Sequence, residues 1–382
     1  MPWVHPIARG WVVRDEVPGP DVDEFAEPER VTVALAEPRA ARSLLAVQHP
    51  HRTPEAVAEG RGLLASLPAA RSTLSVLLRT AYREVTGVVA PYEVDGPDGT
   101  ACGVLCMVDP AAVGAGRVRH SEEIYPEIVA ERAEVLAGLG YATSAAMLVP
   151  VGERDELTAA VRARTNGVAP AVSTVDSRGR RHRLWLTTDT TLLDAVEAHP
   201  LMVADGNHRV AAAAKAGGLL ALVTAGPSLR IGAFHRVLTG TGHTAESLAT
   251  AWRAAGLTVR EQAGATAEPG TAVVRCGGEV LMVDLPAGLD HAVVEEILLA
   301  RALHLDPEGP HVQPLPAGRT PPEGADAVIE LAPVPLATVL AEHAVGRRMP
   351  RKSTYFTPKP RSGLLLADLN AQAQPSAPRN PA

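Results

Sequence analysis

The stretch VADGNHRVAAAAKAGG, residues 203–218, places five polar or flexible residues directly before an alanine-rich run. The apolar segment LMVA at 201–204 predicts a buried strand, and the Asp-Gly pair that follows predicts a sharp turn. The alanine-rich run predicts a helix that ends at the closing Gly-Gly pair, because glycine is common just after helix ends. The stretch therefore predicts a strand, a tight turn and a helix.

The first turn of this helix carries a candidate phosphate site. Free backbone N–H groups and the positive end of the helix dipole favour an anion there, and His208 and Arg209 would add charge-assisted hydrogen bonds. We therefore expect Gly206, Asn207 and Arg209 to bind phosphate and His208 to act in catalysis. Asp205 would repel the anion, so it suits a general base or a ligand of a divalent cation. The structural alternative is a helix capped by Asp205 or Asn207 with Arg209 in a surface ion pair.

Composition limits the class of protein. The chain has 382 residues, of which 46% are hydrophobic and 21% charged, as expected for a soluble protein of more than one lobe. Its net charge of −7 argues against non-specific nucleic-acid binding. There is no apolar run of about 18 residues, and the N-terminus lacks a signal-peptide pattern. Three cysteines give no disulfide framework, so a cytoplasmic protein without membrane or nucleic-acid partners is expected.

Lysine is scarce in this chain. Of 36 basic residues only Lys215, Lys352 and Lys359 are lysines. Where arginine fills most basic positions, the remaining lysines are expected where a compact ammonium group is needed. Lys215 follows the opening motif, and the other two lie in MPRKSTYFTPK, residues 349–359.

The segment 349–359 is a second candidate anchor. We expect Lys352, Ser353 and Thr354 to contact phosphate and Tyr355 to contact the substrate, because hydroxyls beside a lysine suit an anionic ligand. Pro350 and Pro358 bracket the hydroxyl residues and would stiffen the loop. The structural alternative is a solvated basic loop before the last strand.

The segment RHSEE, residues 119–123, is the third candidate. We expect His120 and Glu122 to bind the substrate and Glu123 to supply a general base. Carboxylates at the start of a helix can also serve only as partners of the helix dipole.

The remaining pattern favours an α+β fold with mixed sheets and peripheral helices. PAVSTV and RHRLWLTT flank DSRGR and predict a hairpin over 170–188, while RVTVALAEP at 30–38 gives a weak strand signal. The expected division is a divergent N-terminal region, a lobe with the DGNHR motif, a C-terminal lobe and a disordered tail, at residues 1–109, 110–239, 240–366 and 367–382.

Four segments resemble a bacterial and archaeal family known as domain of unknown function 1015. VADGNHRVAAA is similar to its D-G-H-H-R-Y-x-x-A motif, and VRHSEEIYPEIVAERAEVL to its H-E-x-T segment with a D-R-x-x-L-L helix. DSRGRRHRLWLTTD resembles its G-x-x-H-x-L-W strand, and RMPRKSTYFTPKPRSGLLL its M-P-x-K-S-T-Y-F-x-P-K-x-x-S-G-L ending. The resemblance extends over residues 110–366 and is weaker before them.

The D-G-H-x-R motif in turn resembles that of the ParB/sulfiredoxin superfamily, which includes free-serine kinases. The resemblance implies a ParB/sulfiredoxin-like nucleotide-binding core in which Asp205, His208 and Arg209 serve the nucleotide phosphates. This chain departs from the family at Asn207, where the family usually has histidine, and an amide cannot shuttle a proton. An extra residue in HSEE leaves open whether Glu122 or Glu123 matches the family glutamate.

The leading hypothesis is a nucleotide-dependent phosphotransferase that acts on a small hydroxyl substrate such as a serine-like amino acid. ATP or ADP with Mg²⁺ would be the cofactor, and Lys352 would neutralise charge on the transferring group. The alternative, motivated by Asn207, is a nucleotide- or phosphate-binding regulatory protein with impaired catalysis. Any metal ligands and the oligomeric state stay open at this point.

Overall fold

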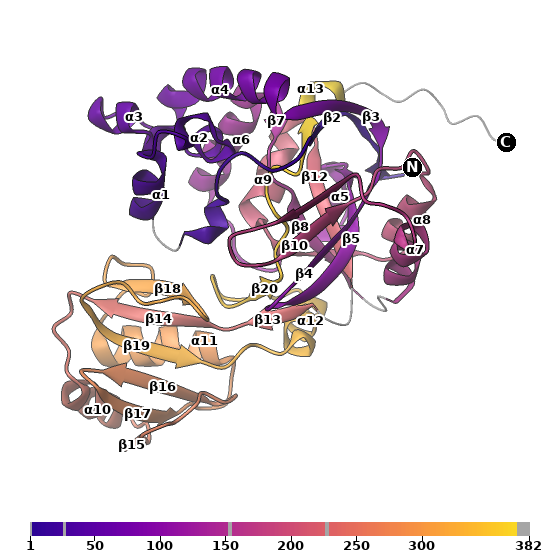
Figure 1. Ribbon diagram of the computed structural model, residues 1–382. Coiled ribbons are helices and arrows are strands. Elements are labelled where there is room, and N and C mark those ends of the chain that lie inside the picture. The colour runs from indigo at the N-terminus through magenta and orange to yellow at the C-terminus, as the bar shows by residue number, and fades with distance from the viewer. Residues whose placement is uncertain (1, 26–27, 152–154, 226–228, 373–382) are drawn as a thin grey trace. The chain divides into compact units, whose positions relative to one another are not determined.

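The chain divides into two compact units (Figure 1). Unit 1 consists of Met1–Leu229 and Thr357–Ala382, and unit 2 of Arg230–Phe356. The chain therefore leaves unit 1, builds unit 2 and returns to unit 1 for its last segment. The computed structural model describes residues 2–25, 28–151, 155–225 and 229–372.

Within the described residues, unit 1 contains a nine-stranded mixed sheet. Its strand order is β6-β11-β8-β12-β5-β4-β10-β9, with β1 paired to β5 beside this path. The strands are β1 (Val4–His5), β4 (Ala90–Gly96), β5 (Gly99–Val108), β6 (Val118–Arg119), β8 (Ala146–Pro150), β9 (Val172–Val175), β10 (Arg181–Leu184), β11 (Leu201–Asp205) and β12 (Leu219–Ala225). β11 pairs with β6 and β12 with β8 in parallel, and the other pairs are antiparallel.

Both faces of this sheet are covered. Along β5, Val104 and Cys106 face α7 (Asp155–Thr165) and α8 (Thr191–Glu197). Leu105 and Met107 point the other way, as expected for the two-residue period of a strand. They pack in a core that α2 (Leu44–Gln48), α4 (Leu67–Thr80) and α6 (Pro126–Leu139) complete.

A four-stranded sheet joins the two ends of the chain in this core. Its order is β3-β2-β21-β7, and Gly10 of β2 lies opposite Ala367 of β21. The strands are β2 (Ile7–Val13), β3 (Tyr82–Val88), β7 (Tyr141–Ala142) and β21 (Leu365–Asp368). The other helical segments of unit 1 are η1 (Val22–Glu24), α1 (Pro28–Leu35), η2 (Ala40–Arg42), η3 (Pro50–Arg52), α3 (Pro54–Ala58), η4 (Leu64–Ser66), α5 (Ala111–Gly114), α9 (Asn207–Ala216) and α13 (Leu369–Gln372).

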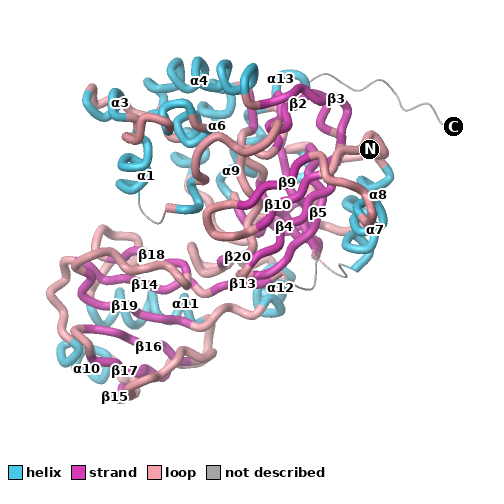
Figure 2. Tube along the Cα trace, viewed as in Figure 1, coloured by secondary structure: helices cyan, strands magenta, loops and turns pink. Residues whose placement is uncertain are grey.

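Unit 2 is a six-stranded sheet with helices on one face (Figure 2). The strand order is β15-β17-β16-β19-β14-β18, and β13 pairs separately with β20. The core lies between the sheet and two helices, with Trp252 and Leu298 fully buried in it. The elements are β13 (Arg230–Gly232), β14 (Phe234–Thr239), α10 (Ala245–Ala254), β15 (Val259–Glu261), β16 (Thr271–Cys276), β17 (Glu279–Asp284), α11 (Asp290–Val293), the π-helix η5 (Val294–Arg301), β18 (Val312–Pro316), β19 (Ala325–Leu331), α12 (Leu336–Ala344) and β20 (Tyr355–Thr357).

The mixed α+β architecture is confirmed, but the division differs from the expected one. No boundary falls at residue 109, because β5 pairs with β4 on one side and β12 on the other, deep in unit 1. The boundary expected at residue 239 falls at 229, and residues 357–366 belong to unit 1. Residues 367–372 are not a disordered tail, since they contribute to β21 and form α13. Residues 373–382 lie outside the described residues.

The sequence pattern predicted the secondary structure correctly where a single hairpin spans the pattern. The hairpin expected over 170–188 is confirmed by the antiparallel pair β9–β10, with Arg181 opposite Val175. The strand signal at 30–38 was wrong, because α1 covers much of that segment. Val31 and Leu35, four residues apart, bury the same helix face. No helix in the described ranges is long and apolar enough to cross a bilayer.

We expect unit 2 to make the protein acid-sensitive through His291. This residue is fully buried, its Nε2 donates to the Phe234 carbonyl at 3.0 Å, and burial lowers its pKa to about 3. Its unfolded-state pKa is near 6.5, so its contribution to stability is complete above that pH and declines as the pH falls below it. At about pH 5 the loss is about 2 kcal/mol.

Urea unfolding at neutral and acidic pH checks this expectation. His291→Gln keeps a neutral donor but does not titrate, so its acid-induced loss of unfolding free energy should be smaller than that of wild type by this amount. Equal losses in the two proteins would contradict the assignment.

Candidate functional site

The strand, turn and helix expected at 201–217 are confirmed. Gly206 follows β11 with a φ of +91°, a left-handed conformation that glycine adopts without the steric cost of a side chain. α9 runs from Asn207 to Ala216 and stops at Gly217, whose φ is +82°. Gly206 has no side chain to cap the helix, so the positive end of the α9 dipole has no side-chain cap of its own.

Asn207 holds residues 120–123, which we call the HSEE segment, at the start of α9 through hydrogen bonds. Its Oδ1 accepts from the Ser121 backbone N–H at 3.1 Å and lies 3.2 Å from His120 Nδ1. Its Nδ2 donates to Ser121 Oγ at 3.2 Å, and both Asn207 and Ser121 are buried. All the polar atoms of the amide are thus used to position a loop. The contacts of Asn207 are those of a positioning residue.

His208 and Arg209 also make contacts that orient them. His208 Nε2 accepts from the Tyr125 backbone N–H at 3.1 Å, and the two rings stack with centroids 5.8 Å apart. This hydrogen bond requires an unprotonated Nε2, so the ring is neutral with its proton on Nδ1. Arg209 Nη1 donates to the Ala145 carbonyl and lies beside Gly206.

We expect Asn207→Ala to release the HSEE segment. The substitution would leave the buried Ser121 N–H without its acceptor and cost about 2 kcal/mol of unfolding free energy. Hydrogen exchange at the Ser121 amide should accelerate accordingly. Asn207→Asp is the matched control, since a carboxylate can accept from His120, the Ser121 N–H and the Ser121 hydroxyl. Similar exchange rates in the alanine variant and wild type would show that this contact does not hold the loop.

Asp205 forms an ion pair with Lys359, a residue close to the C-terminal end of the sequence. Lys359 Nζ donates to Asp205 Oδ1 at 2.6 Å, and 14% of the Lys359 side chain and 31% of the Asp205 side chain remain exposed. Lys359 is one of the three scarce lysines, and it belongs to unit 1. The pair places a carboxylate and an ammonium group together at the end of β11, one residue before the turn into α9.

Asp23 is a further carboxyl in this electrostatic environment that the sequence did not indicate. Burial raises its pKa, and the charges of Asp21 and Asp205 act in the same direction. Lys359 and Arg209 oppose this shift. A carboxyl whose pKa is raised by burial is a candidate for a general acid or base.

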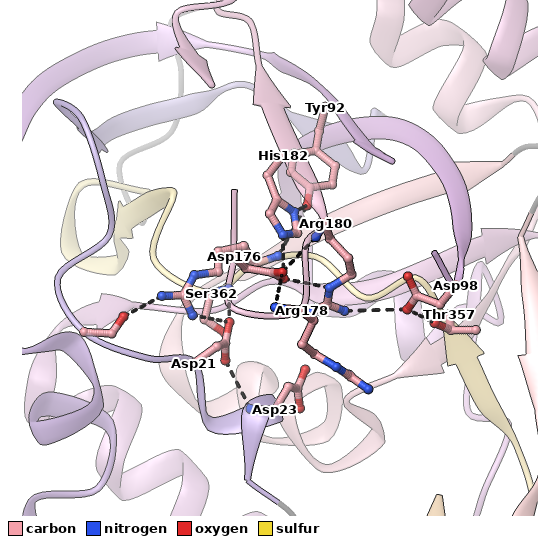
Figure 3. Close-up of polar contacts among 12 residues, drawn as sticks. Asp21, Asp23, Tyr92, Asp98, Asp176, Arg178, Arg180, His182, Thr357 and Ser362 are labelled. Carbon is pink, nitrogen blue, oxygen red and sulfur yellow. Dashed lines mark hydrogen bonds and ion pairs between the residues drawn. The ribbon is translucent and has the colours of Figure 1, made fainter. Parts of the chain in front are cut away.

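A polar network joins the β9–β10 hairpin to residues 357–362, which we call the C-terminal strap (Figure 3). Arg180 Nε donates to Asp176 Oδ2 at 2.7 Å, and Arg180 Nη1 lies 3.9 Å from Asp98 Oδ2. Thr357 Oγ1 donates to the same Asp98 oxygen at 2.6 Å. The sequence predicted only a hairpin turn here; the available signal was the G-x-x-H-x-L-W resemblance, which gave these residues no role.

The predicted residues of the 349–359 segment divide between the two units. Lys352, Ser353, Thr354 and Tyr355 belong to unit 2, whereas Lys359 belongs to unit 1. Lys352 has a φ of +52°, and its Nζ lies 5.8 Å from the centre of the Phe234 ring. Ser353 is buried and donates to the Pro350 carbonyl at 2.7 Å. Thr354 is buried and the Tyr355 ring packs edge-on against Phe234.

Arg236 explains the shape of this loop, and the sequence gave no sign of it. The Arg236 side chain is 3% exposed and pairs with Glu295, and its guanidinium donates to the Arg351 and Lys352 carbonyls, both at 3.1 Å. A buried arginine therefore holds the backbone on which Lys352 is carried. The phosphate-binding role of Lys352, Ser353 and Thr354 stays a prediction, as does substrate contact by Tyr355.

The acidic candidates of the HSEE segment differ in exposure. Glu122 is half-buried and Glu123 is exposed. The described residues contain no cluster of three or more metal-ligating side chains of the His, Cys, Asp and Glu types. Roles for His120, Glu122 and Glu123 in substrate binding or catalysis stay predictions.

Comparison with known families identifies the class. A family model described as a protein of unknown function (DUF1015) matches residues 42–284, more than half of the chain. The chain belongs to this family, as the sequence motifs suggested. No curated protein gives a significant match.

Solved structures with a similar chain trace are distant. A conserved hypothetical protein from Pyrococcus furiosus aligns at a TM-score of 0.41 and 13% identity, over 70% of this chain and 96% of the other. A free serine kinase in complex with AMP gives 0.40 and 14%, over 68% and 92%. SbnI with a C-terminal truncation, from Staphylococcus aureus, gives 0.42 and 15%, over 72% and 90%.

Proposed function

We propose that this protein is a cytoplasmic, nucleotide-dependent phosphotransferase that acts on a small hydroxyl substrate, such as a serine-like amino acid. The observation that carries the proposal is the Asp205–Lys359 pair, with Nζ and Oδ1 2.6 Å apart, beside the start of α9. Phosphoryl transfer needs cations on the phosphate oxygens and a group that accepts the hydroxyl proton. This pair and its neighbours supply both kinds of group. The resemblance to the D-G-H-x-R motif, from which this chain departs at Asn207, supports the same class of reaction.

The roles follow from charge and position. The first turn of α9, with Arg209, would receive phosphate oxygens of ATP or ADP, because helix starts and guanidinium groups both bind anions. Lys359 would neutralise charge on the transferring group, the role that the sequence suggested for Lys352. With Lys359 directed to phosphate, Asp205 would accept the proton of the substrate hydroxyl. His208, fixed by Tyr125, would donate from Nδ1.

Asp23 is a second candidate for the base. Burial raises its pKa, which favours a role in proton transfer, whereas Asp205 is paired with Lys359 in this structure. Mg²⁺ is compatible with this arrangement. The ion commonly binds through one or two carboxylates together with substrate phosphates, so it does not require a cage of protein ligands. Asp205 and Asp23 are the carboxylates that would bind the ion in this way.

The alternative, a binding protein that lost its base, rested on Asn207. That argument weakens because Asn207 holds Ser121, and carboxyls at Asp205 and Asp23 are present for proton transfer. The alternative is therefore an outcome to be distinguished by experiment.

A two-step measurement tests the proposal. Melting temperatures are compared with ADP, ATP and other nucleotides, with and without Mg²⁺, because a ligand of the native state raises the melting temperature. Turnover of the bound nucleotide is then followed with a panel of hydroxy-amino acids and other small alcohols. Stabilisation with turnover supports a kinase. Stabilisation without any turnover supports the binding protein, and no stabilisation by any nucleotide overturns both.

A further inference from the structure

A buried hydrogen-bond chain runs from the β9–β10 hairpin to the C-terminal strap. His182 Nε2 lies 3.0 Å from Asp176 Oδ2, and His182 Nδ1 lies 2.6 Å from the Tyr92 hydroxyl. The Tyr92 oxygen accepts the Arg361 backbone N–H at 3.3 Å. His182 and Tyr92 are 0% and 1% exposed. Figure 3 shows His182 between the Tyr92 ring and Asp176.

Each hydrogen bond in this chain has one direction. An ionised carboxylate only accepts, so His182 Nε2 donates to Asp176. The neutral ring then presents a lone pair at Nδ1, which receives the Tyr92 hydroxyl proton. The Tyr92 oxygen is left to accept from Arg361. Burial lowers the pKa of His182, which favours the neutral ring. Burial alone would raise the pKa of Asp176, but hydrogen bonds from His182 and Arg180 bring it to about 2, which favours the ionised carboxylate. A neutral His182 and an ionised Asp176 are the charge states that these hydrogen-bond directions require.

The strap is fastened on both sides of Lys359. On one side Thr357 donates to Asp98. On the other, the Tyr92 contact fixes the Arg361 backbone, and Asp21 holds both the Arg361 guanidinium at 3.1 Å and the Ser362 N–H at 2.7 Å. Lys359 stands two residues before Arg361, within this fastened segment. These contacts fix the backbone from which the Lys359 side chain reaches Asp205.

We propose that His182 is a positioning residue that, through Tyr92 and the Arg361 backbone, holds Lys359 against Asp205. His182 is fully buried and acts on the site only through its neighbours, so it is not assigned a catalytic role. The polar and charged groups around it are Asp176, Arg180, Arg361 and Tyr92. The importance of this hydrogen-bond chain for catalysis rests on the proposed function, but its role in placing Lys359 does not.

The test uses the scarcity of lysine. The chain has only three lysines, so an amine-acylating reagent followed by peptide mass spectrometry reports the labelling rate of each one in the folded full-length protein. Tyr92→Phe keeps the ring and removes the hydroxyl oxygen that accepts from the Arg361 backbone N–H. We expect Lys359 to label about five-fold faster, since it loses the protection of a partly buried ion pair. Lys215, exposed in the last turn of α9, and Lys352, in unit 2, should keep their wild-type rates.

Tyr82→Phe is the matched control. Tyr82 is equally buried and donates to the Gly363 carbonyl at 2.9 Å, beyond the Arg361 anchor. A smaller effect on Lys359 is expected there, and equal acceleration in both variants would overturn the role of the His182 chain. If Tyr92→Phe does not fold, as judged by circular dichroism, His182→Gln decides, since its amide can still donate to Asp176 but has no acceptor at the position of Nδ1; faster labelling of Lys359 alone is expected there too, and an unchanged rate overturns the role of His182.

These outcomes separate the two proposals. Faster labelling of Lys359 alone, in a protein that shows no phosphoryl transfer, supports the positioning role and counts against the proposed function. An unchanged Lys359 rate in the folded Tyr92→Phe variant overturns the positioning role, whatever activity is found.

Discussion

Lys359→Met is expected to lower kcat/KM for phosphoryl transfer about 100- to 1,000-fold, the usual effect of removing one group that stabilises transition-state charge. Lys359 is the lysine that the structure places on Asp205, with 14% of its side chain exposed. The methionine side chain is similar in length but carries no charge, so packing of the strap is largely kept. Steady-state kinetics with the best nucleotide and hydroxyl substrate measures the effect.

Two further variants sharpen this prediction. Lys359→Arg should recover only part of the rate, because a planar guanidinium group does not replace a compact ammonium group at a single phosphate oxygen. Lys215→Met is the control, since Lys215 is exposed at the last turn of α9, away from the helix start. A Lys359→Met rate close to that of wild type would remove Lys359 from the reaction.

Gly363→Ala is expected to destabilise the protein by about 3 to 4 kcal/mol, as judged by urea unfolding. Gly363 follows the strap with a φ of +80°, a backbone conformation that alanine adopts only with strain. An added Cβ would also overlap Leu44 and lie 2.9 Å from Val17 Cγ1. Left-handed strain and overpacking therefore act together at this one position.

Gly167→Ala separates these two causes. Gly167 has a similar φ of +71°, but an added Cβ would meet no atom within 4 Å. Only the conformational cost, about 1 to 2 kcal/mol, is expected there. If both variants lose the same stability, crowding against Leu44 and Val17 makes no contribution.

Some of the site could be predicted from the sequence. The Asp-Gly turn and the alanine-rich run specify β11, Gly206 and α9 within one short stretch, because strand period, left-handed glycine and helix propensity all act over a few residues. The β9–β10 hairpin is specified in the same way. The lysine count directed attention to residues 349–359, and the neighbouring hydroxyl residues favoured Lys352 as the phosphate ligand, whereas the contact with Asp205 is made by Lys359.

Other features depended on residues distant in sequence. Asn207 and Ser121 are 86 residues apart, so the amide's structural contacts could not be recognised from its motif. Asp23 lies in a region without a matching motif, and its pKa is raised by burial, which no local pattern reports. At 30–38 the local signal was misleading, because packing of Val31 and Leu35 on one face favours a helix over the strand suggested by β-branched residues.

The sequence by itself determined the family, the α+β class and the local frame of the candidate site, since each is encoded in nearby residues and short motifs. Only the tertiary structure decided which charges meet at the start of α9. Asp205 and Lys359 are 154 residues apart, and unit 2 is inserted between them. Their contact exists because the returning strap is held by Asp98, Tyr92 and Asp21, and such long-range anchoring arises only when the whole of unit 1 packs.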